Sequence, residues 1–198
     1  MNGYISGKYE GLITKHCMES DSVNPAGMAY DIMKQKEMRM HGPEHHYLTA
    51  AVLVAAYCNE KNLVPEKAEL LRKVFYRTNM LPPGACGFYG ICGDVQAVGA
   101  AVSLLLKITP YSGSELKMLN EVTAKCQQRM ACFKGQRCCK RATFSNVYEG
   151  AKCMNDMLGT SFVVENTGTC EFSHKNDTCN KNECQFYKNS FERERKNG

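Results

Sequence analysis

Two long apolar segments constrain the fold of this chain more than any other feature of its sequence. The run from Leu48 to Tyr57 is apolar on almost every side at helical spacing, and Pro43-Glu44 supplies a helix start before it. A second segment, from Val95 to about residue 108, is rich in Ala, Gly and Leu, and Asp94 precedes it as an N-cap. Because such segments are buried on all sides, we expect two central helices, 43–57 and 94–108, inside a helical bundle.

Four further segments carry a proline or serine start signal, or an apolar face at helical spacing. They predict helices over 25–36, from 65 onward, from 112 or 114 to about 130, and over 141–157.

The remaining sequence carries weaker signals. The first 24 residues show no clear periodicity, and Ser161–Glu165 is the one strand candidate, so we predict an all-α fold. With 198 residues, the chain is long enough for one domain with a short appendage. We expect a helical cysteine-loop domain over 1–160 and a polar, cysteine-rich tail over 161–198.

The composition predicts a protein that lies outside the membrane and keeps its thiols reduced. No basic segment followed by an apolar run marks a secretory signal, and no apolar stretch reaches membrane-spanning length, so we expect a cytoplasmic protein without a membrane partner. Reduced thiols favour metal binding over disulfides for the 12 cysteines. The net charge of +5 is mild, and no stripe of aromatic and basic residues accompanies it, which argues against nucleic acid as a partner.

Five cysteines lie in two glycine-containing loops that run into predicted helices. Cys86 and Cys92 are separated by five residues, as are Cys132 and Cys138, and Cys139 follows directly. The positive end of a helix dipole is expected to lower thiol pKa values there, which suits a metal ion or an iron–sulfur cluster.

An alternative is that some cysteines are simply small buried side chains, and we adopt it for Cys58 and Cys153 on predicted helices. Cysteines separated by two residues do not occur anywhere in the chain, which argues against zinc ribbons and thioredoxin-type chemistry.

The segment His41-Gly-Pro-Glu-His-His46 matches the spacing of one group of zinc peptidases. That motif needs a continuous helix, and Gly42-Pro43 leaves His41 outside it. We expect His45 and His46 to face a pocket, as proton donors or acceptors, anion ligands or metal ligands. A capping or core role is the alternative.

The tail contains Cys170, His174, Cys179 and Cys184, four residues of the types that bind zinc. They predict a closed zinc site, because a metal can organise a segment that buries little apolar surface. A second cluster, or recruitment of these cysteines into the first one, is the alternative.

The histidine segment, the loop Cys86-Gly-Phe-Tyr-Gly-Ile-Cys92-Gly and the run Arg137-Cys-Cys-Lys-Arg141 together resemble an uncharacterised cysteine-rich domain family of prokaryotes. The resemblance covers about residues 25–187 and implies no established activity.

A more distant resemblance concerns Cys92 to Ser103 with the following Thr109-Pro110, which is similar to the helical catalytic domain of iron–sulfur L-serine dehydratases. It implies that Cys92, Cys132 and Cys139 hold a [4Fe–4S] cluster whose open iron helps to expel the substrate hydroxyl.

Together these observations favour a lyase, of the dehydratase or desulfidase type, acting on a small anionic substrate. His45 or His46 would handle protons, and Arg137 or Arg141 would pair with a substrate carboxylate. The rival hypothesis is a non-catalytic metal or redox sensor, or an accessory protein that docks on a partner enzyme. The sequence leaves open whether the chain forms a homo-oligomer.

Overall fold

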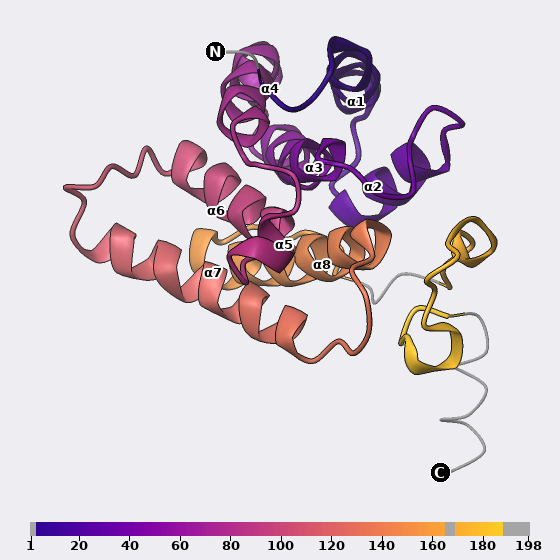
Figure 1. The fold of residues 1–198 in the computed structure, drawn as a ribbon. Coiled ribbons are helices and arrows are strands. Elements are labelled where there is room, and N and C mark those ends of the chain that lie inside the picture. Colours follow the sequence, from indigo (N-terminus) through magenta and orange to yellow (C-terminus); the bar gives the residue numbers. More distant parts are fainter. Residues whose placement is uncertain (1–2, 165–168, 188–198) are drawn as a thin grey trace, which may run out of the picture.

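The computed structural model describes residues 3–164 and 169–187, and the regular elements of these residues are all helical (Figure 1). The all-α fold class predicted from the sequence is confirmed. The α-helices are α1 Gly7–Glu19, α2 Pro25–Lys34, α3 Glu44–Glu60, α4 Val64–Asn79, α5 Ala85–Phe88, α6 Gly93–Leu105, α7 Ser114–Ala131 and α8 Cys139–Leu158, and the 3₁₀ turns η1 Ser173–Lys175 and η2 Lys181–Glu183 follow.

Helix α3 is the centre of the molecule, as its apolar sequence predicts. Every side chain from Glu44 to Ala56 is buried, and α3 packs against α1, α2, α4, α6 and α8. Helix α6 is the second central helix and packs against α3, α4, α7 and α8. Despite this apolar interior, no helix in the described part of the chain is long and apolar enough to cross a membrane.

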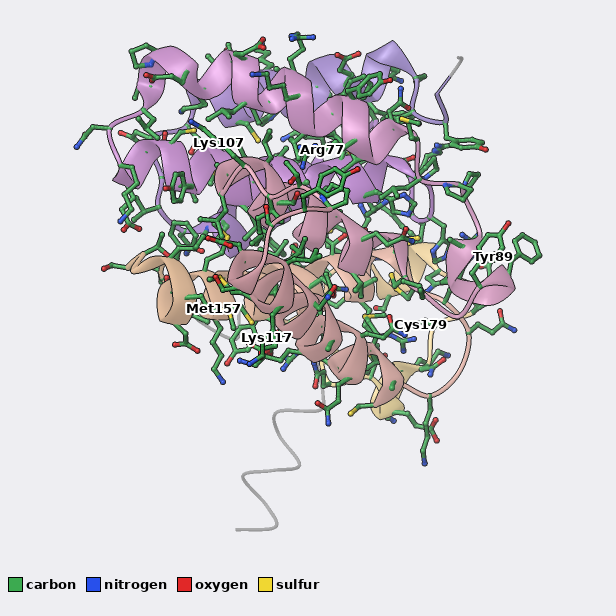
Figure 2. The ribbon with its side chains drawn as sticks, turned by 90° about the vertical axis from the view of Figure 1, so that its left-hand side faces the viewer. Arg77, Tyr89, Lys107, Lys117, Met157 and Cys179 are labelled. Atoms are coloured by element: carbon green, nitrogen blue, oxygen red, sulfur yellow. The ribbon has the colours of Figure 1, made fainter. Side chains whose placement is uncertain are left out.

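Helices α4 and α6 are joined by a cation at a helix end. The Arg77 guanidinium of α4 donates to the hydroxyl of Ser103 at 3.0 Å and to the carbonyl of Ala100 at 3.4 Å (Figure 2). Both acceptors lie near the C-terminal end of α6, where a positive charge is favourable.

The first helix, α1, lies in the region where the sequence shows no periodicity, so the expectation of an irregular N-terminal segment was wrong. Only Ile13 and Cys17 are buried along it. A buried lysine of α4, Lys67, donates to the carbonyls of Cys17 and Ser20, at 3.3 and 2.9 Å. These carbonyls have no partner within α1, and Lys67 therefore ties the end of α1 to the core.

The expected strand at Ser161–Glu165 is also wrong for the residues that the structure describes, 161–164, which form no strand. The first N–H group of this segment donates to the carboxylate of Glu60, and that of Phe162 donates to Asn155 Oδ1 at 2.8 Å. Side chains, rather than a neighbouring strand, satisfy this backbone. Glu165 lies outside the described residues.

Residues 169–187 fold against α8 through aromatic side chains. The rings of Phe172 and Phe186 lie 6.3 and 5.4 Å from that of Phe144 on α8, measured between centroids. Both tail rings are buried in the same hydrophobic core as the helices. The predicted tail unit, 161–198, extends past the described residues.

Candidate functional site

A large open pocket lies where the N-terminal ends of three helices meet. The first turns of α3, α6 and α8 line it, together with α5 and the C-terminal end of α7. Its volume is about 830 Å³, within the range of small-molecule sites. The three helix starts surround the pocket with partly positive backbone N–H groups. Both cysteine loops recognised in the sequence border this space.

Four of the five loop cysteines, Cys86, Cys92, Cys138 and Cys139, line this pocket. Cys92 directly precedes α6, and Cys139 is the first residue of α8. The two cysteines therefore lie at the starts of two helices that pack together. The fifth cysteine, Cys132, is exposed at the end of α7 and is not among the lining residues. The structure therefore brings Cys92, Cys139 and Cys86 to one space and leaves Cys132 apart.

The thiol pKa values shift in the direction opposite to the one expected from the helix dipoles. Burial raises the pKa of Cys92, and it raises the pKa of Cys139 to about 12. The backbone N–H groups of Asp94 and Val95 act to lower the pKa of Cys92, but burial is the larger effect. Both thiols are thus protonated in the metal-free chain, and a bound metal would be needed to hold them as thiolates.

Asp94 is a pocket residue whose role the sequence did not reveal. It was expected to cap the helix, but α6 begins one residue earlier, at Gly93, and the carboxyl group is buried in the first turn. Oδ2 accepts a hydrogen bond from Thr143 at 3.1 Å, and the hydroxyl groups of Thr143 and Thr49 both act to lower the pKa of the carboxyl group. Burial raises the pKa of Asp94 to about 7. An acidic residue two positions after Cys92, at the start of an apolar helix, was the available signal.

His46 lines the pocket, as predicted, and is packed tightly against the start of α6. A Cβ atom on Gly93 would lie 2.2 Å from His46 Nε2, so only glycine fits beneath the ring. His46 Nδ1 is buried without a hydrogen-bond partner. Burial lowers the pKa of His46 to about 4, and the ring is therefore neutral at pH 7.

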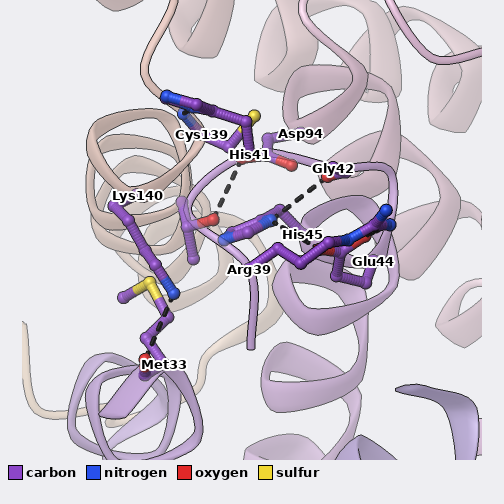
Figure 3. A network of polar contacts seen from close by, with 10 residues as sticks. Met33, Arg39, His41, Gly42, Glu44, His45, Asp94, Cys139 and Lys140 are labelled. Atoms are coloured by element: carbon purple, nitrogen blue, oxygen red, sulfur yellow. Dashed lines mark hydrogen bonds and ion pairs between the residues drawn. The ribbon is translucent and has the colours of Figure 1, made fainter. Parts of the chain in front are cut away.

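His45 does not line the pocket, because it belongs to a polar network at the base of α3 (Figure 3). Its Nδ1–H donates to the carbonyl of Gly42 at 3.1 Å. In the same network Arg39 donates to both oxygens of the buried Glu44, at 3.0 and 2.5 Å. Burial lowers the pKa of His45 well below its ordinary value. These contacts hold the start of α3 in place.

The first turn of α8 is held by residues from two other segments (Figure 3). The N–H group of Cys139 donates to His41 Nδ1 at 3.4 Å, and His41 Nε2 lies 3.3 Å from Asn176 Oδ1 in the tail. The buried Lys140 donates to the carbonyl of Met33 at 3.1 Å. His41 lies before α3, as Gly42-Pro43 predicts, and links the tail to the start of α8.

The two candidate arginines take different positions at the pocket. Arg137 is exposed and lines the pocket wall. Arg141 also lines the pocket, but it is buried and donates to the carbonyls of Lys134 and Gln136, at 3.3 and 2.9 Å. Arg141 therefore shapes the second cysteine loop, and Arg137 is the better placed of the two to meet a ligand.

The tail cysteines face a second, much smaller cavity of about 20 Å³. Cys170, Cys179 and Cys184 line it, and Cys138 from the second loop lines it as well. His174, the fourth predicted ligand, is exposed and is not among the lining residues. The structure thus places Cys138 beside the three tail cysteines, and the predicted grouping of His174 with them was wrong.

All 12 cysteines lie within the described residues, and all are free thiols. As the side chains stand in residues 3–164 and 169–187, no three His, Cys, Asp or Glu side chains come close enough to hold one metal ion.

One protein family matches the chain. Its model carries the description "Family of unknown function (DUF5714)" and matches residues 13–187. The match begins in α1 and ends at the last described residue of the tail, so it includes both cavities. No curated protein and no solved structure matches the chain.

Proposed function

We propose that this chain, which belongs to the family of unknown function DUF5714, holds an iron–sulfur cluster where α6 and α8 begin, and acts there as a lyase on a small anionic molecule. The observation that carries the proposal is the meeting of Cys92, Cys139 and the buried Asp94 in one open pocket of about 830 Å³. This space contains candidate metal ligands, a candidate base and room for a substrate.

The pocket has the volume for a cluster, and cysteine thiols that could bind one line it. A cluster holds each thiolate on a different iron, so its ligands lie farther apart than those of one ion. We propose Cys86, Cys92 and Cys139 as the ligands, with Cys86 in place of the exposed Cys132 because Cys86 lines the pocket. When bound, a cluster with three protein ligands supplies one open iron that acts as a Lewis acid on the leaving group.

The positive features around the pocket favour an anionic substrate. The starts of three helices, which carry partial positive charge, line it, and Arg137 lies on its wall. A planar guanidinium can bind a carboxylate through two parallel hydrogen bonds. We therefore propose that Arg137 binds the substrate carboxylate and that Arg141 holds the second cysteine loop in shape.

Asp94 is the proposed base. With a pKa of about 7, a substantial fraction of this carboxyl group is ionised at neutral pH. It would take the proton from the carbon next to the substrate carboxylate, and the electron pair of that C–H bond would form the new C=C bond. The neighbouring C–O or C–S bond would break, and the leaving group would depart with its electron pair and gain a proton from solvent. His46, which is neutral, would orient the leaving group.

The test is metal and sulfide analysis of protein purified without oxygen. We expect about four irons and four sulfides per chain in the wild type. Both should be lost in Cys92→Ala and Cys139→Ala and retained in Cys132→Ala, the exposed control. Loss in Cys132→Ala with retention in Cys86→Ala would instead favour the ligand set implied by the dehydratase resemblance. A wild-type chain without iron would contradict the proposal.

Activity is then tested on small hydroxy and thio carboxylic acids. Asp94→Asn should lower kcat by about 10²–10⁴-fold while the cluster content stays unchanged. An active Asp94→Asn variant would remove Asp94 from the proposed mechanism.

A second candidate function, an accessory or sensor protein, is favoured by the apolar loop beside the pocket. Phe88, Tyr89 and Ile91 are 82%, 71% and 45% exposed, and Tyr89 projects from the surface (Figure 2). Large exposed aromatic side chains are common at protein interfaces. A cluster whose electron paramagnetic resonance spectrum is unchanged by every substrate tested, in a chain without turnover, would favour this function over the lyase.

A further inference from the structure

We infer that Cys138, Cys170, Cys179 and Cys184 form a second metal site, which holds a single zinc ion and fixes the C-terminal segment to the start of α8. The inference concerns a different cavity from that of the proposed function and does not depend on it. It rests on the size of the cavity, on hydrogen bonds to the sulfur atoms and on a buried cation beside them.

The cavity has the size of one ion. Its volume of about 20 Å³ accommodates roughly one water-sized particle, and this space is too small for a cluster. Four thiols from three parts of the sequence line it, and their number matches the closed tetrahedral coordination of structural zinc.

Backbone N–H groups already point at two of the sulfur atoms. Phe172 N–H donates to Cys170 Sγ and Lys181 N–H donates to Cys179 Sγ, each at 3.4 Å and each from two residues further along. Hydrogen bonds of this kind orient metal-bound thiolates and offset their charge.

Arg141 supplies the compensating positive charge. Four thiolates around Zn²⁺ carry a net charge of −2, which is unfavourable in a buried cavity without a nearby cation. Arg141 is 6% exposed and lines the cavity, and its Nε has no hydrogen-bond partner. The same side chain lines the large pocket, so it connects the two sites.

The thiols must turn inward to bind. No three of them lie at ligand spacing as they stand, whereas zinc holds each sulfur at about 2.3 Å. We propose that the cysteine side chains turn inward by rotation about χ1 when zinc binds. His174 is outside the cavity, and the ligands are therefore four sulfurs and no nitrogen.

The experiment counts zinc in the full-length chain, purified under reducing conditions, and replaces the zinc with cobalt. We expect about one zinc per chain, and a Co²⁺ spectrum with the intense d–d bands of tetrahedral coordination and the charge-transfer absorption of four thiolates. Each of Cys138→Ser, Cys179→Ser and Cys184→Ser should weaken zinc binding by about tenfold or more. His174→Ala and Cys132→Ser, both at exposed positions, should retain zinc.

Wild-type protein without zinc, a cobalt spectrum with fewer than four thiolates, or retention of zinc in Cys138→Ser would overturn the inference. Loss of zinc in His174→Ala would do so as well. The cobalt spectrum of the wild type gives the thiolate count even where a cysteine variant does not fold. Cys92→Ala must leave zinc unchanged, so failure of this site and failure of the cluster site can be distinguished.

Discussion

At the residue scale, two neighbouring cysteines are assigned to different proposed sites. Cys138 has an extended backbone just before α8, whereas Cys139 is already helical, so their side chains leave the backbone in different directions. Cys138 reaches the small cavity with the tail cysteines, and Cys139 lies beside Asp94 and Cys92. The pair Cys138-Cys139 is therefore the point where the two proposed sites meet.

Asp94 gives a pH-dependent prediction for the metal-free chain. Its folded pKa of about 7 lies above the ordinary value of 3.8, so the native state keeps a proton that the unfolded chain releases between these values. The carboxyl group therefore lowers stability as pH rises from about 4 to 7. Asp94→Asn should match the wild type near pH 4 and exceed it by roughly 2–4 kcal/mol at pH 8, measured by urea unfolding. A difference that does not change with pH would show that the carboxyl group is not buried as described.

The close packing of Gly93 against His46 gives a prediction about stability. Gly93→Ala would place a methyl group against the His46 ring and should destabilise the chain by about 1–3 kcal/mol. Gly87→Ala is the matched control, because that glycine lines the same pocket and a Cβ atom there would meet nothing within 4 Å. Equal unfolding free energies for the two variants would contradict the described contact between His46 and Gly93.

At the scale of elements, His41 takes the place of a side-chain cap on α8. The residue before the helix, Cys138, makes no side-chain capping bond, and the Cys139 N–H group donates to His41 instead. His41→Ala should cost about 0.5–2 kcal/mol, typical of a lost N-cap, and should speed hydrogen exchange in the first turn of α8. Unchanged exchange there would show that His41 does not stabilise this helix end.

The sequence predicted those helices whose own residues carry an apolar pattern or a start signal. The apolar runs of α3 and α6 identified the central helices, and Asn24-Pro25 marked the start of α2. Helix α1 was missed because it buries only two apolar side chains and contains Gly7 and Gly11, and its end depends on Lys67 from another helix. Residues 161–164 have strand-like composition, but the neighbouring side chains satisfy their backbone.

The same distinction applies to the candidate sites. The residue types in the two loops and in the tail were recognisable, because thiols near glycine and near one another form a local pattern. Which of these thiols lie together could not be predicted, because this depends on the direction of the chain at the start of α8 and on how the tail packs on Phe144. The regrouping of Cys138 with the tail, and the inward position of Asp94, follow from tertiary contacts that no local spacing encodes.

At the scale of the whole molecule, the tail is joined to the helices by aromatic packing, by the His41–Asn176 contact and by the proposed zinc site. Chelation of zinc from the reduced chain should therefore loosen residues 169–187 and the first turn of α8 and leave α3 and α4 protected. Hydrogen exchange with and without chelator measures this. Equal loss of protection in all helices would show that zinc stabilises the fold globally.

The central claim is that two different metal centres meet at the start of α8. The most direct measurement is the zinc, iron and sulfide content of Cys138→Ser and Cys139→Ser, purified side by side without oxygen. We predict that Cys138→Ser loses zinc and keeps iron and sulfide, and that Cys139→Ser loses iron and sulfide and keeps zinc. Loss of the same metal from both variants, or of neither metal, would contradict the account.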